Sequence, residues 1–221
     1  MFILFVCGTL SLSAQGKSEF QIGLATPSGD FADDDAEDAI FGGSGYASTG
    51  FYLGYKLLTP LSSKGLFWTF SAGIMYNDLS GDYKDELEEE MEDYYDDFDI
   101  TYLKYLNIPI MAGLQYEQPI SEQIKLFGEA GLGINVLKLT NMSYSTDDSE
   151  GTYSFDPSLK LGYKIGGGVL IQNKYTISLT YTGLGSHKVK YTYEEDSDSE
   201  DDKFDKALSI SSLNVIFGIR F

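Results

Sequence analysis

Most residues that could do acid–base or metal chemistry in this chain are carboxylates. The chain has 34 Asp and Glu against 15 Lys and Arg, with one His and one Cys, and its formal net charge is -19. A nucleophilic triad would need His187, the only histidine, and no G-x-S-x-G turn occurs. Zinc sites of the usual kind need more His and Cys ligands. We therefore expect a protein that is not an enzyme.

Two acidic runs are dense enough in oxygen ligands for Ca²⁺ or Mg²⁺, which are hard cations. Run 30–38 is centred on Asp33, Asp34 and Asp35, and run 194–202 begins with Glu194, Glu195 and Asp196. Neither run has the calcium-loop motif with its turn-forming glycine. We expect no cofactor beyond weak Ca²⁺ or Mg²⁺ association with these candidate cation-binding loops.

A third acidic run carries aromatic side chains. Tyr94, Tyr95 and Phe98 lie among the carboxylates of the block 78–99. Aromatic residues are favoured anchors in protein interfaces, so this segment is a candidate contact for a basic protein partner. The chain has no basic patch, which phosphate-backbone binding requires, and nucleic acid is therefore excluded as a partner.

The carboxylates are segregated along the chain. Thirty of the 34 fall into four blocks, 27–43, 78–99, 139–157 and 192–206. The sequence between the blocks is rich in Tyr, Phe and Gly and alternates between apolar and small or polar residues. Period-two alternation is typical of strands with two differently solvated faces. It predicts eight strands, at about 19–25, 46–57, 66–77, 101–116, 124–138, 158–171, 175–191 and 207–221.

The connections between these strands alternate in length. Short turns at about 58–65, 117–123 and 172–174 alternate with the four acidic blocks. Short turns on one side and long loops on the other are typical of outer-membrane barrels with an even strand number. The sequence therefore predicts an all-β fold, an eight-stranded antiparallel transmembrane β-barrel with four long acidic loops and short periplasmic turns. We expect the loops to be solvated and mutually repelling, and Pro109 to mark a bulge.

Soluble sandwiches and lipocalin-type barrels also alternate, with the apolar face inward. Two features favour an apolar face that points to lipid: the second face is too small and polar to form a core, and strands of about 10 or more residues suit a tilted membrane crossing. Such a barrel is just wide enough to be filled by side chains. The charged residues predicted for its lumen form an ion network around one acid: Lys56, Lys125, Glu129, Lys160 and Lys164.

The first residues read as an export signal. Residues 2–14 form an apolar stretch that ends in small residues, although no Lys or Arg precedes it. We therefore assign residues 1–14 to a signal peptide and 15–221 to the barrel domain. Cys7 lies inside the stretch, and a lipoprotein cleavage before it is the less favoured alternative, because the preceding residues are bulky.

Two segments carry a family resemblance. The chain resembles small bacterial outer-membrane barrels of the PorT-like and OmpA-like type in YLKYLNIPIMAGLQY (102–116) and in the closing LNVIFGIRF (213–221). The resemblance implies export, contact with outer-membrane lipid and an eight-stranded closed sheet. It also implies that Phe221 is the insertion signal read by the outer-membrane insertion machinery. It implies no activity.

These observations together predict a non-enzymatic protein of the cell envelope, in the outer membrane with its loops extracellular and its termini periplasmic. Its acidic loops would contact cations or partners. The alternatives are a narrow small-solute channel, an accessory component of protein secretion, as the PorT-like resemblance suggests, and a soluble ligand-binding barrel.

Overall fold

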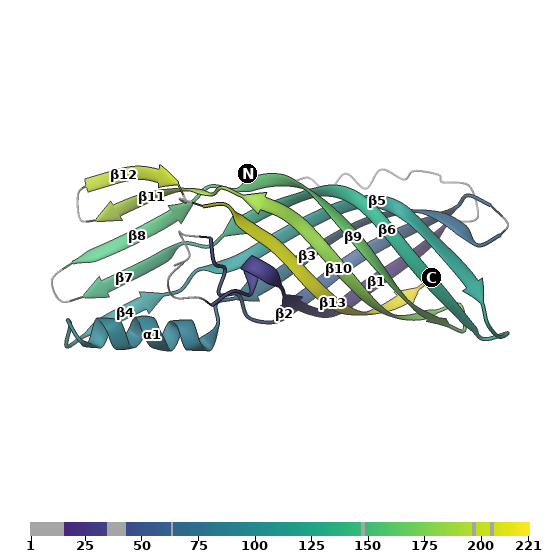
Figure 1. The fold of residues 1–221 in the computed structure, drawn as a ribbon, viewed down its shortest axis with the longest axis horizontal. Coiled ribbons are helices and arrows are strands. Elements are labelled where there is room, and N and C mark those ends of the chain that lie inside the picture. Colours follow the sequence, from purple (N-terminus) through teal and green to yellow (C-terminus); the bar gives the residue numbers. More distant parts are fainter. Residues whose placement is uncertain (1–15, 35–42, 63, 147–148, 196–197, 204–205) are drawn as a thin grey trace.

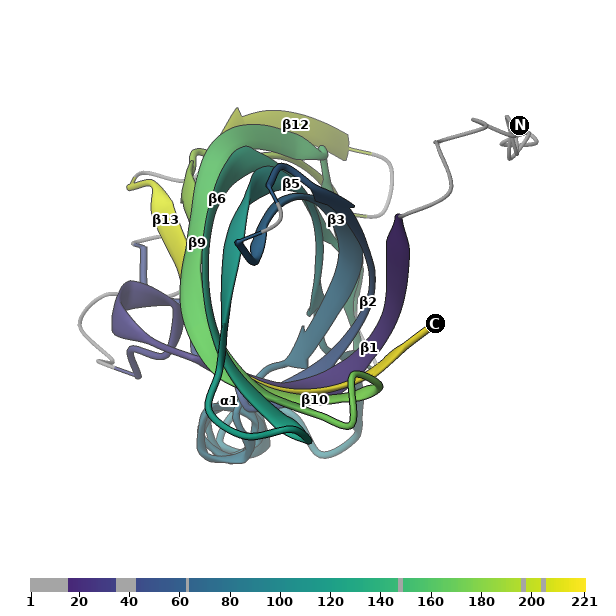
Figure 2. The same cartoon turned by 90° about the vertical axis from the view of Figure 1, so that its right-hand side faces the viewer.

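Eight long strands close into a barrel in the computed structural model, which describes residues 16–34, 43–62, 64–146, 149–195, 198–203 and 206–221 (Figures 1 and 2). The predicted signal peptide, Asp35 and Asp196 lie outside the described residues. The barrel strands are β1 (Lys17–Pro27), β2 (Gly50–Pro60), β3 (Leu66–Asp78), β5 (Lys104–Pro119), β6 (Ile124–Leu139), β9 (Ser158–Ile171), β10 (Tyr175–His187) and β13 (Leu208–Arg220). Their order is β1-β13-β10-β9-β6-β5-β3-β2, with every neighbouring pair antiparallel. The predicted eight-stranded antiparallel barrel is confirmed.

Large apolar side chains cover the outside of the barrel. Phe51, Trp68 and Phe217 are 49%, 52% and 40% exposed, and Ile110 is half-buried on the same face. Many inner positions between them are Gly, Ser, Thr, Asn, Gln and charged residues, as the alternation predicts, but large apolar side chains such as Met75, Met111 and Phe127 also face inward and are buried. A barrel that turns apolar side chains outward and polar ones inward is suited to a lipid surround.

The connections of the two barrel ends differ in length. Three short turns join β2 to β3, β5 to β6 and β9 to β10, and both described chain ends lie at this short-turn end, where Ser18 and Phe221 exchange backbone hydrogen bonds of 2.9 Å (Figure 1). In the last turn Gln172 and Asn173 have φ of 52° and 55°. Positive φ at both central residues is the geometry of the tight hairpin that suits twisted strands.

Three of the four long connections form strands of their own in the described part of the chain. Three of the acidic blocks contribute to a second, five-stranded sheet, which we call the wall: β12 (Asp198–Lys203), β11 (Lys190–Glu195), β8 (Glu150–Phe155), β7 (Met142–Thr146) and β4 (Phe98–Thr101), in that spatial order. These strands follow or precede β13, β10, β9, β6 and β5, so the wall prolongs one side of the barrel (Figure 1). The expectation of mutually repelling loops does not describe these strands: β7, β8 and β11 place Tyr144, Tyr153, Tyr191 and Tyr193 on one shared face, which lets that face pack.

A helix and a closing segment complete this end. Helix α1 (Gly81–Glu92) begins after Ser80, whose Oγ accepts a hydrogen bond from the Tyr83 amide, and it runs alongside β4 (Figure 1). The short 3₁₀ helix η1 (Gly29–Phe31) belongs to the β1–β2 connection and packs against β13. No helix in the described part of the chain is long and apolar enough to cross a membrane.

The expected bulge at Pro109 is wrong. Pairing of β5 with β6 runs without a register shift from Tyr105 to Pro119, so Pro109 sits in a regular ladder. Proline has no backbone N–H to donate to a neighbouring strand. On the β3 side of β5, the pairing is interrupted at Pro109, between the pairs Ala72–Ile110 and Met75–Asn107. The register shift instead lies in β10, between Gly183 and Gly185, where Leu184 is the extra residue.

Candidate functional site

The half of the lumen nearer the short turns holds a buried ion cluster. Glu129 Oε2 lies 3.3 Å from Lys164 Nζ and 3.4 Å from Lys56 Nζ. Lys56 Nζ also contacts Glu19 Oε1 at 3.2 Å and donates to Gln115 at 3.1 Å. The side chains of Lys56, Glu129 and Lys164 are all less than 10% exposed. The structure thus brings together three of the five residues predicted for the lumen.

A second group of ion pairs lies closer to the short turns than the first. Its main members, Arg220, Glu19 and Glu117, were not predicted from the sequence. Arg220 contacts Glu19 Oε2 at 3.0 Å and Glu117 Oε1 at 2.6 Å, while Lys125 reaches Glu117 at 3.9 Å. The half of the lumen nearer the short turns, which we call the lower lumen, therefore contains three acids, and the expectation of a single acid is wrong. Strand parity was the available signal, because Glu19 and Glu117 share the inward register of Gln21 and Gln115.

Lys160, the remaining predicted network member, lies elsewhere. It is exposed near the long-loop end of β9, where it pairs in register with Asn135, and it takes part in none of the described ion pairs. Its inward parity agrees with the prediction, but its height along the strand places it above the cluster. Alternation predicts the face of a residue and says little about its depth in the barrel.

An apolar plug fills the half of the lumen nearer the wall. Phe31 packs edge-on against Tyr105 with ring centroids 5.0 Å apart, and the Tyr105 hydroxyl donates to the Gly45 carbonyl at 2.6 Å. The buried apolar members around them come from both barrel and connections: Tyr46, Leu79, Leu103, Leu137, Leu139, Leu184, Val189, Leu208 and Ile210. Between plug and ion cluster remains an enclosed space of about 20 Å³, room for about one water molecule.

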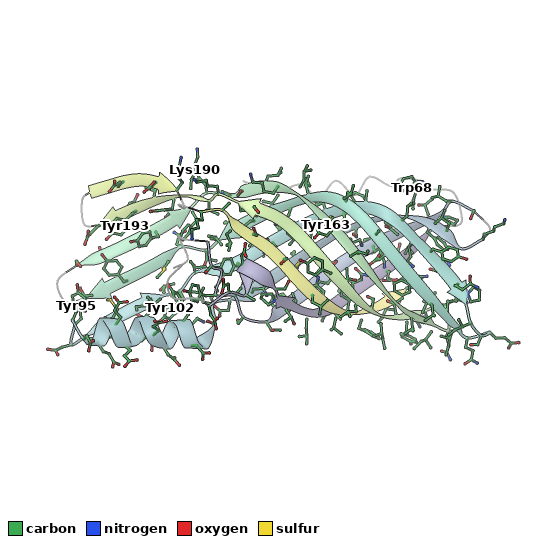
Figure 3. The ribbon with its side chains drawn as sticks, viewed as in Figure 1. Trp68, Tyr95, Tyr102, Tyr163, Lys190 and Tyr193 are labelled. Carbon is green, nitrogen blue, oxygen red and sulfur yellow. The ribbon has the colours of Figure 1, made fainter. Side chains whose placement is uncertain are left out.

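The inner side of the wall carries a row of aromatic side chains, which we call the tyrosine face: Tyr144, Tyr153, Tyr191 and Tyr193, with Phe98, Ile100, Met142 and Phe155 beside them. Tyr153 stacks on Tyr193 at 4.5 Å between centroids, and the Tyr144 and Tyr193 hydroxyls are 2.6 Å apart. Phe155 is buried in the apolar plug, and Tyr153 and Tyr191 pack against it. The tyrosine face thus continues the plug along the long axis, away from the short turns, toward the left end of Figure 3.

Carboxylates border the tyrosine face. Glu195 accepts a hydrogen bond from the Tyr144 hydroxyl at 3.2 Å. Glu200 and Asp202 lie opposite Tyr193 and Tyr191 in the β11–β12 register and so share their face. Burial and the hydrogen bonds with Tyr144 and Glu195 raise the pKa of Tyr193 above its usual value. Lys190, of the opposite parity, points away from the wall (Figure 3). The result is a half-buried aromatic surface with acids along one margin.

The predicted partner-binding aromatics are only partly brought together. Phe98 opens β4 on the tyrosine face, opposite Thr146. Tyr94 is 78% exposed beyond the end of α1, and Tyr95 lies with it at the tip of the molecule (Figure 3). Sequence spacing could not show this, because Phe98 belongs to a strand whereas the two tyrosines belong to a helix–strand turn.

The predicted cation-binding acids are dispersed. Asp33 and Asp34 are exposed after η1, while Glu194 and Glu195 lie on opposite faces of β11. Within the described ranges no three His, Cys, Asp or Glu side chains are grouped so that they could hold a metal ion. Association of Ca²⁺ or Mg²⁺ with the acidic segments stays a prediction.

The two remaining candidate residues have simple surroundings. His187 is fully buried in the plug region, with Nε2 3.0 Å from the Leu184 carbonyl oxygen and 3.5 Å from the Asn135 amide nitrogen. Phe221 is 72% exposed at the short-turn end, with its ring 6.5 Å from that of Tyr55 on the outer face. Recognition of Phe221 by the outer-membrane insertion machinery stays a prediction.

Comparison with known proteins identifies the architecture. A family model described as "Outer membrane protein beta-barrel domain" matches residues 13–207. The chain is similar in structure to a major outer membrane protein from Thermus thermophilus, at 12% identity and a TM-score of 0.54, over 94% of this chain and 100% of that one. It is also similar to the outer membrane protein OprG from Pseudomonas aeruginosa, at 11% identity and a TM-score of 0.50, over 93% and 95%. No curated protein matches.

Proposed function

Because this chain belongs to the outer membrane protein beta-barrel domain family, we propose that it is a non-enzymatic protein of the cell envelope that binds a basic polypeptide on its tyrosine face. The wall lies outside the cell. The short turns, the start of β1 and the end of β13 face the periplasm. This orientation is supported by the short-turn and long-connection asymmetry, which in such barrels separates periplasm from exterior.

The tyrosine face with its acidic margin is the observation that carries the proposal. Tyrosines supply large, rigid contact area and are frequent anchors in interfaces. A Lys or Arg side chain over the ring of Tyr153 or Tyr193 would gain a cation–π contact. The same cation would lie near Glu195, which is held in place by Tyr144. The net charge of -19 adds long-range attraction for a basic partner.

Adjacent glutamates of β11 provide a matched test. Glu195→Gln removes a charge from the tyrosine face, whereas Glu194→Gln removes the same charge from the opposite face. We expect a Lys/Arg-rich peptide, titrated by calorimetry against the detergent-solubilised protein, to bind about tenfold more weakly to Glu195→Gln, which corresponds to about 1.4 kcal/mol. Glu194→Gln should retain nearly full affinity. Equal losses in both variants would show non-specific charge attraction and reject the site.

The aromatic contribution is tested separately. Tyr193→Ala removes the ring that stacks on Tyr153 and leaves the chain's charge unchanged. We expect it to weaken binding of the same peptide severalfold, as truncation of an aromatic anchor does. The small-solute channel finds no support in the lumen, since the plug and the ion cluster leave an enclosed space of only about 20 Å³. Planar-bilayer recording of the purified barrel should accordingly show no single-channel steps.

A further inference from the structure

The barrel opens at its short-turn end into a cavity of about 920 Å³, which we call the vestibule. Lys17, Phe67, Glu117 and Lys125 line it from four strands, and Lys64 of the β2–β3 turn reaches its rim. Arg220 is buried behind this lining, where it pairs with Glu117. The vestibule is separate from the tyrosine face, at the opposite end of the molecule, so what it binds is independent of the function proposed above.

The lower lumen and vestibule together hold more positive than negative charge. The described ionised side chains that face inward there from the barrel strands are five cations, Lys17, Lys56, Lys125, Lys164 and Arg220, and three carboxylates, Glu19, Glu117 and Glu129; Lys64 of the turn is a further cation at the rim. Buried charge is costly unless it is paired. In a chain whose net charge is -19, the strand residues of this region therefore carry a surplus of two cations.

Ion-pair geometry locates that surplus at the mouth. Glu19 and Glu129 are each held by two deep cations at 3.0–3.4 Å. Glu117 is engaged by Arg220 at 2.6 Å, and Lys125 reaches it only at 3.9 Å. Lys17 makes none of the described ion pairs; its Nζ lies over the Phe67 ring, 4.9 Å from the centroid. The three deep cations, Lys56, Lys164 and Arg220, balance the three carboxylates at short range. Lys17 and Lys125 therefore carry the surplus charge, although Lys125 has a long contact with Glu117.

We propose that the vestibule binds a phosphate group. A dianionic phosphate matches the two surplus charges, and lysine binds phosphate well as a point charge on a flexible stem. Phe67 limits water access on one side of Lys17, which strengthens its attraction for an anion. Two sources share this chemistry: the headgroup of a phosphate-bearing lipid at the membrane edge, and a soluble phosphorylated molecule that enters from the aqueous side.

Calorimetric titration with inorganic phosphate tests the site, in a maltoside detergent that carries no phosphate and at constant ionic strength. We expect saturable binding to the parent protein and at least a tenfold loss in Lys17→Gln and in Lys125→Gln. Lys174→Gln is the matched control, because Lys174 lies in the turn at the same end, over the Tyr175 ring, and does not line the vestibule. Heat-modifiable gel migration verifies that each variant remains folded.

A second arm separates the sources. The protein is reconstituted in phosphatidylcholine vesicles with and without phosphatidic acid, and lipid retained after delipidation is measured by native mass spectrometry. Retention of phosphatidic acid that depends on Lys17 and Lys125 assigns a lipid headgroup, whereas phosphate binding without it assigns a soluble ligand. The proposal is overturned if neither probe binds saturably, or if all three lysine variants lose binding equally.

Discussion

Each wall strand adjoins a barrel strand in the sequence, yet the two regions turn different side chains inward. Strand β10 of the barrel turns small polar residues inward, whereas β11 of the wall turns tyrosines inward. In the barrel, Ile177 and Leu179 of β10 face out and are 49% and 51% exposed, while Thr176 and Ser178 face in and are buried. In the wall, Tyr191 and Tyr193 of β11 face in and the exposed Glu194 faces out. The difference follows the surrounding medium, since lipid favours apolar side chains outside and water favours charged ones.

A single extra residue reverses the pattern between β10 and β11. The odd-numbered positions are mostly aliphatic or aromatic on both sides of the bulge, but they face outward up to Tyr181 and inward from His187 onward. The inserted Leu184 shifts the parity, and Gly185 accommodates the turn with a φ of +90°. A period-two sequence can therefore suit both lipid and water when one bulge lies at the boundary between them.

The largest expected effect concerns the polar interior. Glu129→Leu leaves Lys56 and Lys164 without the carboxylate they share, and removing one partner of a buried ion pair costs about 3–5 kcal/mol. Urea unfolding of the folded barrel in detergent measures the loss. The double variant Glu129→Leu/Lys164→Leu should recover a large part of it, because the uncompensated charge of Lys164 is gone. If the double variant is less stable than the single one, the cost does not come from unpaired charge.

A smaller effect is expected at the boundary between the two regions. A Cβ at Gly185 would lie 2.7 Å from the Leu161 carbonyl oxygen, at a φ that L-residues avoid. Gly185→Ala should cost about 1–3 kcal/mol, the usual range for a strained backbone position. Gly128→Ala is the matched control, since its nearest described neighbour is 3.9 Å away. Equal stability of the two variants would show that the bulge needs no glycine.

The apolar plug is tested by a still smaller change. Tyr105→Phe removes the hydroxyl that donates to the Gly45 carbonyl and keeps the ring against Phe31. We expect a loss of about 0.5–1.5 kcal/mol, the usual contribution of one hydrogen bond. The measurement is thermal unfolding followed by loss of the heat-modifiable gel band. An unchanged midpoint would mean that the β1–β2 connection is not held by this contact.

The smallest effect is a pH dependence at the base of the wall. Burial and the neighbouring Tyr46 raise the pKa of Tyr83 to about 12. A phenol whose folded pKa is raised contributes stability that is complete below its unfolded pKa, about 10, and is lost as the pH rises toward 12. Ultraviolet titration of phenolate in the parent protein and in Tyr83→Phe should differ by one late-ionising group. A difference at about pH 10 would contradict the packing of α1 against Tyr46.

The sequence predicted the barrel well because one signal, alternation, repeats over strands of 11–16 residues. The wall was missed because its strands have four to six residues and lie inside acidic blocks, so charge dominated the interpretation. Glu129, Lys56 and Lys164 could be paired from parity. Arg220 and Glu19 meet across the β1–β13 closure, 201 residues apart in sequence, and only the closed ring brings them together.

Site-specific labelling along β10 and β11 tests the reversal most directly. Single cysteines that carry a fluorophore are placed at Ile177, Tyr193 and Glu194 in the protein reconstituted in vesicles. We predict that a lipid-soluble quencher reaches Ile177 alone, that a water-soluble quencher reaches Glu194 freely, and that Tyr193 is partly protected from both. Water access at Ile177 equal to that at Glu194 would contradict the account, because the barrel's apolar face would then not lie in lipid.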